Sequence, residues 1–391
     1  MARSSRLQRS LDRYLGIPAI HAIGLMRKRR RELPRQVARI GLIQPSAIGD
    51  MFLVSGLVAH LHRRYPEAEI HVFHSAFNGG AVQLLLTDVI SHRCDFTHPR
   101  AALRELRNTK LDILINSAPW TRLTALLTAL SGAKATFGFR SRGQGIHRAF
   151  DVAVPYREDR HEIANHREMA ELFGPLEAYQ LAIRQVDRAP SKSLPYDKLV
   201  LMHATPGGSA AKPKSWPEER WAELVRRLTG KGLIVAFTGT QADHFTIDAI
   251  LSAAIVPSEN AFSLAGVLSL PELAYVLNRV KLLITVDTGV AHLAAALNAS
   301  VVCLHGPTRF ARWGACNRRA TGIDSSHPAA GYIHFGFESH PQQDEIMATI
   351  SVDAVEAAVA ARLSEARDPQ KGDLAPDDAS APEQRWRSAT S

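Results

Sequence analysis

Short apolar runs alternate with longer segments of helical periodicity along most of the chain. The run Ile40–Ile43 is typical of a buried strand. From Met51 to Tyr65 the apolar residues recur at helical spacing, which predicts an amphipathic helix that ends at Pro66. Glu69–Phe73 reads as a second strand, so the opening of this region is predicted to be a βαβ unit.

The alternation continues on both sides of a proline-bearing stretch, residues 175–197, that has little periodicity. The other expected strands and helices are Leu111–Asn116, Thr121–Leu130, Ala135–Phe139, Leu199–Met202, Glu218–Thr229, Leu233–Thr238, Pro271–Asn278, Lys281–Val286 and Ser300–Leu304. Strands that alternate with helices form parallel sheets. The sequence therefore predicts an α/β protein with two Rossmann-like halves and ligands in a cleft between them, at the carboxyl ends of the strands.

The expected organisation has five parts. A basic N-terminal extension covers residues 1–39, followed by one Rossmann-like domain at 40–185 and a second at 186–350. An alanine-rich closing helix is expected at 351–365. The remaining residues, 366–391, are rich in proline, aspartate and serine, which predicts a disordered tail.

Composition limits the class of protein. The chain has 391 residues, of which 46% are hydrophobic, enough for two buried cores. No window contains the roughly 18 consecutive apolar residues that a membrane span needs. The three cysteines, Cys94, Cys303 and Cys316, have no metal-ligand spacing. They fit a reduced cytoplasmic compartment better than a disulfide framework.

The positive charge is concentrated at the N-terminus. Residues 1–39 contain eleven Lys or Arg and two Asp or Glu, so their net charge of +9 equals that of the whole chain. The apolar stretch Leu15–Met26 is short and ends in five basic residues, which argues against a cleaved signal peptide. Contact with an anionic membrane surface is expected, and a solvated tail or an arm that pairs with the protein's own acidic groups are the alternatives. Nucleic acid is not an expected partner, because the body lacks net charge.

The segment Val286–Leu293 is the strongest candidate site. The strand ends at Asp287-Thr288-Gly289, and an alanine-rich helix that includes His292 follows at once. A helix N-terminus presents unpaired N–H groups and a positive dipole end, which together bind phosphate. Asp287 can accept from sugar hydroxyls, whereas Thr288 and His292 can donate to phosphate. In the alternative reading, Asp287 only caps the helix and His292 only packs against it.

The loop Thr205–Pro217 also favours phosphate binding. It offers backbone amides, the hydroxyls of Thr205 and Ser209, and Lys214 as a point charge for a diphosphate. The loop is not a Walker A loop, and no G-x-G-x-x-G follows any strand, which counts against a dinucleotide redox enzyme. Trp216-Pro217 leads into a helix and is expected to be structural.

Asp50 follows a loop of small residues that includes Ser46 and Gly49. It is either a helix N-cap or a general base that takes a proton from an acceptor hydroxyl. The four loops Ser46–Asp50, Thr205–Lys214, Asp287–His292 and Gly306–Arg309 all follow strands, and they are expected to face one cleft.

Basic residues gather between positions 140 and 167. Residues 140–149 read as a polar loop, and five more Arg or His residues follow: Arg157, Arg160, His161, His166 and Arg167. They are either solvated charges or a basic wall for an anionic acceptor.

Four motifs in order resemble those of the lipopolysaccharide heptosyltransferases, glycosyltransferase family 9. Pro45–Asp50 resembles the family's S-x-I-G-D loop, and Pro206–Pro217 its P-G-…-K-x-W-P loop. Asp287–Leu297 is similar to D-T-G-x-x-H-L-A-A-A-L. Leu304–Thr308 with Trp313-Gly314 resembles L-F-G-P-T…W-G. The resemblance extends over about residues 40–355.

The resemblance implies a GT-B fold and an inverting transfer of heptose from ADP-heptose to a lipopolysaccharide core. It makes 40–185 the acceptor-side domain and 186–350 the nucleotide-sugar-binding domain. It implies an anionic glycolipid acceptor at the cytoplasmic face of the inner membrane and no metal. Asp50 is then the base, and the implied donor-binding residues are Ser209, Lys214, Asp287, Thr288, Gly289 and His292.

Three features depart from the family pattern. His305 stands where phenylalanine is usual, Arg309-Phe310 replaces Asp-Pro, and the loop Gly239–His244 lacks the frequent glutamate. Alternatives are a transferase that uses a UDP-hexose or UDP-hexosamine, a nucleotide-sugar epimerase or hydrolase, and a catalytically silent scaffold.

Overall fold

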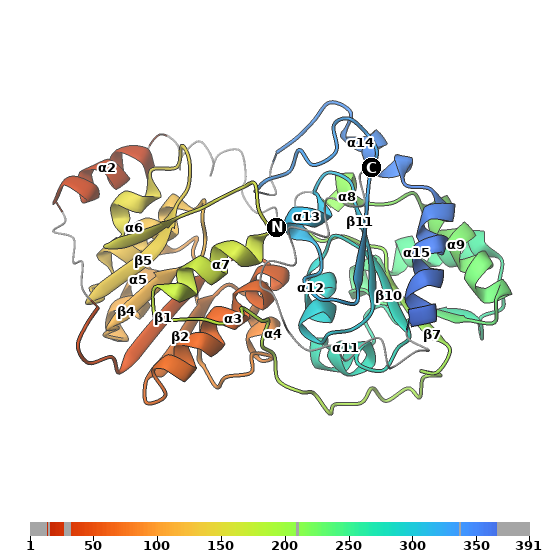
Figure 1. Ribbon diagram of the computed structural model, residues 1–391, viewed down its shortest axis with the longest axis horizontal. Coiled ribbons are helices and arrows are strands. Elements are labelled where there is room, and N and C mark those ends of the chain that lie inside the picture. The colour runs from red at the N-terminus through yellow and green to blue at the C-terminus, as the bar shows by residue number, and fades with distance from the viewer. Residues whose placement is uncertain (1–13, 15, 27–32, 209–210, 336–337, 366–391) are drawn as a thin grey trace. The chain divides into compact units, whose positions relative to one another are not determined.

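The computed structural model describes residues 14, 16–26, 33–208, 211–335 and 338–365 (Figure 1). The chain divides into two compact units, Met1–Gln185 and Val186–Ser391. About half of the basic extension and the whole predicted disordered tail lie outside the described residues. Each unit is an α/β structure with its own sheet.

The sheet of the first unit consists of six parallel strands. They are β1 Arg39–Gln44, β2 Glu69–His74, β3 Ile90–Arg93, β4 Ile113–Asn116, β5 Ala135–Arg140 and β6 Val152–Pro155. Their order is β3-β2-β1-β4-β5-β6, and Ile43 of β1 lies opposite Phe73 of β2 and Asn116 of β4. The order reverses between β1 and β4. Ligands of such sheets bind beside this reversal.

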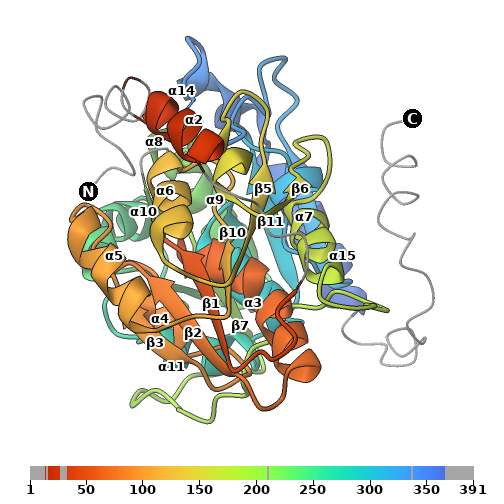
Figure 2. The ribbon, with the colours of Figure 1, turned by 90° about the vertical axis from the view of Figure 1, so that its left-hand side faces the viewer.

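Helices cover both faces of this sheet. They are α2 Ile17–Met26, α3 Ile48–Arg64, α4 Gly79–Val82, α5 Pro99–Asn108, α6 Arg122–Leu130, the 3-10 helix η2 Ile146–Ala149, and α7 Glu162–Glu171. Helices α3 and α7 pack together on one face, and α5 and α6 pack together on the other (Figure 2). Helix α2 adds to the second group, because its buried Ile20 packs against Ile146 and Phe150.

The second unit repeats this sheet. Its strands are β7 Leu199–His203, β8 Ile234–Phe237, β9 Ala261–Ser263, β10 Leu282–Val286, β11 Val301–His305 and β12 Ala320–Asp324. All pairs are parallel, in the order β12-β11-β10-β7-β8-β9. The reversal lies between β7 and β10, so the loops after these two strands are neighbours.

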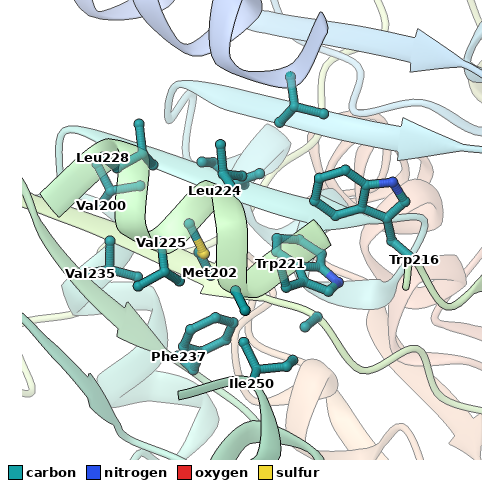
Figure 3. Close-up of a cluster of buried hydrophobic side chains, with 14 of the residues drawn as sticks. Val200, Met202, Trp216, Trp221, Leu224, Val225, Leu228, Val235, Phe237 and Ile250 are labelled. Atoms are coloured by element: carbon teal, nitrogen blue, oxygen red, sulfur yellow. The ribbon is translucent and has the colours of Figure 1, made fainter. Parts of the chain in front are cut away.

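The helices of the second unit complete its core. They are α8 Ala211–Lys214, α9 Glu218–Gly230, η3 Gln241–Asp243, α10 His244–Ala254, α11 Leu270–Leu277, α12 Gly289–Ala296, α13 Phe310–Trp313, α14 Gln343–Ile346, η4 Met347–Thr349 and α15 Val352–Glu365. Helix α9 packs against both α10 and α15, and its apolar residues Trp221, Leu224, Val225 and Leu228 are all buried (Figure 3). Trp216 is buried beside Trp221, with ring centroids 5.0 Å apart, which confirms its structural role.

The two tandem Rossmann-like sheets confirm the predicted fold class. Three details differ. The first helix begins at Ile48, before the predicted Met51, so Asp50 lies inside it. The edge strands β3, β6, β9 and β12 and the helices α5 and α7 were not predicted, because their sequences are short or polar. Helix α10, which is mostly apolar, was also not predicted. Part of the proline-bearing stretch 175–197, which is expected to link the two halves, is fixed to the first unit, since the backbone of residues 182–184 bonds to residues 84–86.

Candidate functional site

Three loops of the second unit meet where its strand order reverses. Lys214 comes from α8 after β7, Asp287 follows β10, and Thr308 follows β11. Because adjacent parallel strands end at the same edge of a sheet, these side chains come within reach of one another. The Lys214 Nζ lies 2.7 Å from Asp287 Oδ2. Lys214 and Asp287, which the sequence places in loops at the same edge of the sheet, are therefore in contact.

Two residues that were not among the predicted site residues join this pair. The Thr308 hydroxyl donates to Asp287 Oδ2 over 2.9 Å, and its oxygen lies 3.1 Å from His305 Nδ1. His305 and Thr308 are 0% and 2% exposed. Position after a buried strand is a signal that could have identified them, because β11 ends beside β10.

Asp287 is buried and charged. Burial by itself raises the pKa of this carboxyl. The adjacent Lys214 ammonium, together with His305 and His292, outweighs burial and holds the pKa well below its usual range. The Lys214 and Asp287 side chains are only 19% and 9% exposed, so water screens their attraction weakly. The result is a fixed carboxylate with a nearly buried lysine at the reversal of the sheet.

The turn into α12 presents backbone N–H groups beside this carboxylate. Thr288 is the N-cap residue of α12, with extended backbone, and its hydroxyl oxygen lies 3.3 Å from that of Thr285. Thr288 and not Asp287 therefore caps the helix, so the capping part of that alternative is wrong. Gly289 begins α12, and His292 is buried in its second turn. The arrangement is able to bind an anion at the helix N-terminus.

The loop after β7 is described in part. Thr205 is half-buried, and its hydroxyl oxygen is buried without a hydrogen-bond partner among the described residues. Ser209 lies outside the described residues. Lys212, two residues before Lys214, points to a different partner, Asp344, and its side chain is 80% exposed. Of the two lysines, only Lys214 belongs to the buried network.

In the first unit, Asp50 lies in the first turn of α3, beside the strand-order reversal. The N-cap residue is Ala47, so the alternative that Asp50 is the N-cap is wrong. Gly49 is buried, whereas Ser46 and Asp50 are half-buried. Ala47 has φ 56° and ψ 138°, a conformation that favours glycine and costs on the order of 1–3 kcal/mol in other residues. Strained backbone therefore introduces the helix that carries Asp50.

The basic residues near position 160 have partners within the first unit. Arg157 pairs with Asp159, Arg160 with Glu168 and Arg167 with Glu171. His161 accepts a hydrogen bond from the backbone N–H of Ile163 at the start of α7. His166 is buried, and burial lowers its pKa to about 4. These contacts favour a structural role over a basic wall.

The described residues contain neither a candidate metal centre nor a membrane-spanning helix. No three His, Cys, Asp or Glu side chains in the described ranges are grouped so that they could hold a metal ion. No described helix is long and apolar enough to cross a membrane. The expectation that the loop of Asp50 meets the three loops of the second unit stays a prediction.

Comparison with known proteins identifies the family. Residues 100–333 match the sequence profile of glycosyltransferase family 9 (heptosyltransferase). Lipopolysaccharide heptosyltransferase 2 of Escherichia coli K12 is 27% identical over 304 residues, which cover 69% of this chain and 83% of that protein. Lipopolysaccharide heptosyltransferase 1 of the same strain is 30% identical over 224 residues, 54% of this chain and 65% of that protein.

Solved structures share the fold. E. coli ADP-heptose lipopolysaccharide heptosyltransferase II superposes with a TM-score of 0.65 at 22% identity, over 84% of this chain and 99% of that one. E. coli heptosyltransferase WaaC with ADP-2-deoxy-2-fluoro heptose gives 0.63 at 18% identity, over 83% and 99%. The family profile spans more than half of the chain and the fold agrees with it, so this protein belongs to glycosyltransferase family 9 and is a glycosyltransferase.

Proposed function

We propose that this enzyme transfers heptose from ADP-heptose to a lipopolysaccharide core sugar, with inversion at the anomeric carbon. The observation that carries the proposal is the buried network of Lys214, Asp287 and Thr308 beside the N-terminus of α12. Relatives named lipopolysaccharide heptosyltransferase support the acceptor class, and the neighbour solved with a fluorinated ADP-heptose supports the donor.

Donor binding is assigned to the second unit. In the proposed complex, the Lys214 ammonium turns from Asp287 toward the diphosphate, which the N–H groups at Thr288 and Gly289 also bind. Asp287 accepts hydrogen bonds from ribose or sugar hydroxyls. Thr205, Ser209 and His292 complete the proposed donor site. Lys214 and the helix N-terminus offset the charge of the leaving ADP, so the proposed reaction needs no metal ion.

Proton transfer is assigned to Asp50. In a single displacement, Asp50 takes the proton of the acceptor hydroxyl while that oxygen forms a bond to the anomeric carbon. The bond from this carbon to the diphosphate oxygen breaks on the opposite side, and ADP leaves with the bonding electron pair. Ser46 in the loop before α3 and Gly49 in the first turn of α3 support the position of Asp50 in the proposed site.

The proposed site of action is the cytoplasmic surface of the inner membrane. Helix α2 exposes 85% of Leu25 and 77% of Met26, directly before the basic sequence at residues 27–31. Apolar side chains beside basic residues favour binding to anionic lipid. This supports an acceptor held in the membrane and an enzyme bound to its surface.

A second candidate is transfer from a different nucleotide sugar. The loop Gly239–His244 lacks the glutamate that the family often has, and its only carboxylate is used locally. Asp243 accepts hydrogen bonds from the N–H and hydroxyl of Thr240, a capping box. Nucleoside recognition by this loop therefore differs from the family pattern, which favours a test of the base.

A thermal-shift screen tests both candidates. The full chain is titrated with ADP, UDP and GDP and with the corresponding nucleotide sugars. We expect ADP and ADP-heptose to raise the melting temperature most. A preference for UDP redirects the assignment to a hexose or hexosamine, and release of free sugar without an acceptor redirects it to a hydrolase.

A further inference from the structure

His305 is a buried histidine beside the donor-side carboxylate. It ends β11, where the family motif has phenylalanine, and none of its surface is exposed. Its ring packs edge-on against Phe310, with centroids 5.4 Å apart. Its Nδ1 lies 3.1 Å from the Thr308 hydroxyl oxygen, whereas its Nε2 has no hydrogen-bond partner among the described residues.

Proton counting fixes the tautomer of this histidine. The Thr308 hydroxyl has one hydrogen, which it donates to the carboxylate of Asp287. The contact between Thr308 and His305 therefore requires that His305 Nδ1 carries a hydrogen and donates it. If the ring is neutral, Nε2 carries no hydrogen and has only a lone pair. It therefore needs no acceptor, and none is present among the described residues. The hydrogen bonds run in one direction, from His305 through Thr308 to Asp287.

Burial favours this neutral form and outweighs the sum of the charged groups around His305. Burial lowers the pKa of His305, and Lys214 lowers it further, whereas Asp287 and Asp324 act to raise it. The balance is a pKa below the usual value. His305 therefore donates from Nδ1 without carrying a charge of its own.

These hydrogen bonds from His305 through Thr308 to Asp287, called the relay below, become important when Lys214 no longer contacts Asp287. In the proposed complex, Lys214 turns to the diphosphate, and Asp287 then loses its closest cation. Resting on that proposed function, we infer that His305 is a positioning residue for donor binding. It holds the Thr308 hydroxyl toward Asp287, so that this carboxylate keeps its charge and place when the donor binds. Phenylalanine at this position has no group that orients Thr308.

Variants of both relay residues test the inference. ADP binding to the full chain is measured by calorimetry for His305→Phe, Thr308→Val and the double variant. Loss of one hydrogen bond predicts ADP binding weaker by about 3- to 10-fold in each single variant. Because His305 acts through Thr308, the double variant is expected to bind as Thr308→Val does. His305→Asn keeps a donor near the position of Nδ1 and is expected to restore most of the affinity.

Kinetics separate positioning from a general loss of structure. We expect His305→Phe to raise the donor KM by a similar factor, with kcat at saturating donor within about twofold of the wild type. His166→Phe replaces a buried histidine of the first unit and is the matched control, with unchanged donor KM. Equal ADP affinity in His305→Phe and wild type, or additive losses in the double variant, would overturn the relay.

A measurement without any ligand makes the test independent of the proposed function. NMR of the 15N-labelled histidines in the full chain reports which ring nitrogen of His305 carries the hydrogen. We expect a neutral ring protonated at Nδ1, assigned by the signal that disappears in His305→Phe. A ring protonated at Nε2 refutes the relay, whatever nucleotide binds. If the tautomer is as expected but wild type does not bind ADP, the donor assignment fails instead.

Discussion

The two sheets have the same strand order, yet each holds its acidic residue in a different way. Asp287 precedes α12, is buried, and is fixed by Lys214 and Thr308. Asp50 is the third residue of α3 and is half-buried. An ion-paired carboxylate with a lowered pKa is a poor proton acceptor, whereas it is a well-placed hydrogen-bond acceptor. Asp287 is therefore suited to binding the donor, and Asp50 is the better candidate for the base.

The backbones at the two positions differ as well. Thr288 enters α12 with φ −145° and ψ 169°, which any residue adopts. Ala47 enters α3 with φ 56° and ψ 138°, which favours glycine. Strain of this kind gathers at functional sites, where surrounding contacts hold it in place. The strained turn therefore lies on the side of the molecule that we assign to proton transfer.

The largest expected effect comes from Asp50→Ala. If Asp50 is the base, turnover falls by a factor of about 100 or more, because general base catalysis contributes that much. Calorimetry should show that donor binding persists, since donor contacts are assigned to the second unit. Glu219→Gln removes an exposed acid from the first turn of α9 and is the control. Near-normal turnover in Asp50→Ala would contradict the assignment of Asp50 as the base.

Lys214→Ala tests whether the second unit binds the donor diphosphate. Loss of a charge-assisted contact to the diphosphate predicts donor affinity lower by about 10- to 100-fold. Asp287 also loses its buried partner, so the melting temperature should fall. Lys212→Ala removes an exposed lysine two residues away and should change neither. A donor titration equal to the wild type would exclude Lys214 from the site.

His166→Leu tests how a buried histidine with no role in the proposed site affects stability as pH changes. The pKa of His166 is about 4 in the folded protein, below the ordinary 6.5, so protons favour the unfolded state. Stability is therefore retained above pH 6.5 and lost as pH falls toward 4, by about 1.4 kcal/mol between pH 7.5 and 5.5. The unfolding free energy of the variant, measured with denaturant, should not show this fall between pH 7.5 and 5.5. His62→Leu, on the exposed side of α3, should keep the wild-type slope.

Ala47→Gly has the smallest expected effect and tests the strained turn. Glycine adopts φ 56° without a steric penalty, so we expect a gain in unfolding free energy of about 1 kcal/mol, measured with denaturant. Ala101→Gly, at an exposed position of α5, should instead lower stability by about 1 kcal/mol. A loss of stability in both variants would show that Ala47 is not strained.

Much of the fold could be predicted because its signals are local. The apolar runs at β1, β7, β10 and β11 are buried on both faces of a parallel sheet, and such strands are strongly apolar. The edge strand β3 reads Ile-Ser-His-Arg and lies partly in solvent. Its polar composition removes the signal on which strand prediction depends. Helix α7 was missed for a related reason, since its polar residues make contacts that only the folded chain supplies.

For the candidate site, too, local sequence predicts some features and the fold determines the others. The sequence alone determined that Asp287 follows a strand and precedes a helix, and that Lys214 lies in a loop after another strand. It also placed Asp50 after the first strand, because strand and helix periodicity are properties of neighbouring residues. The motifs of the family added the expected roles.

Only the tertiary structure decided which of these side chains meet. The pairing of β10 with β7 on one side and β11 on the other brings Lys214, Asp287 and Thr308 together, although they are 73 and 21 positions apart. Strand order depends on long-range packing, which no local pattern encodes. The direction of the relay from His305 likewise became visible only once burial and hydrogen-bond partners were known.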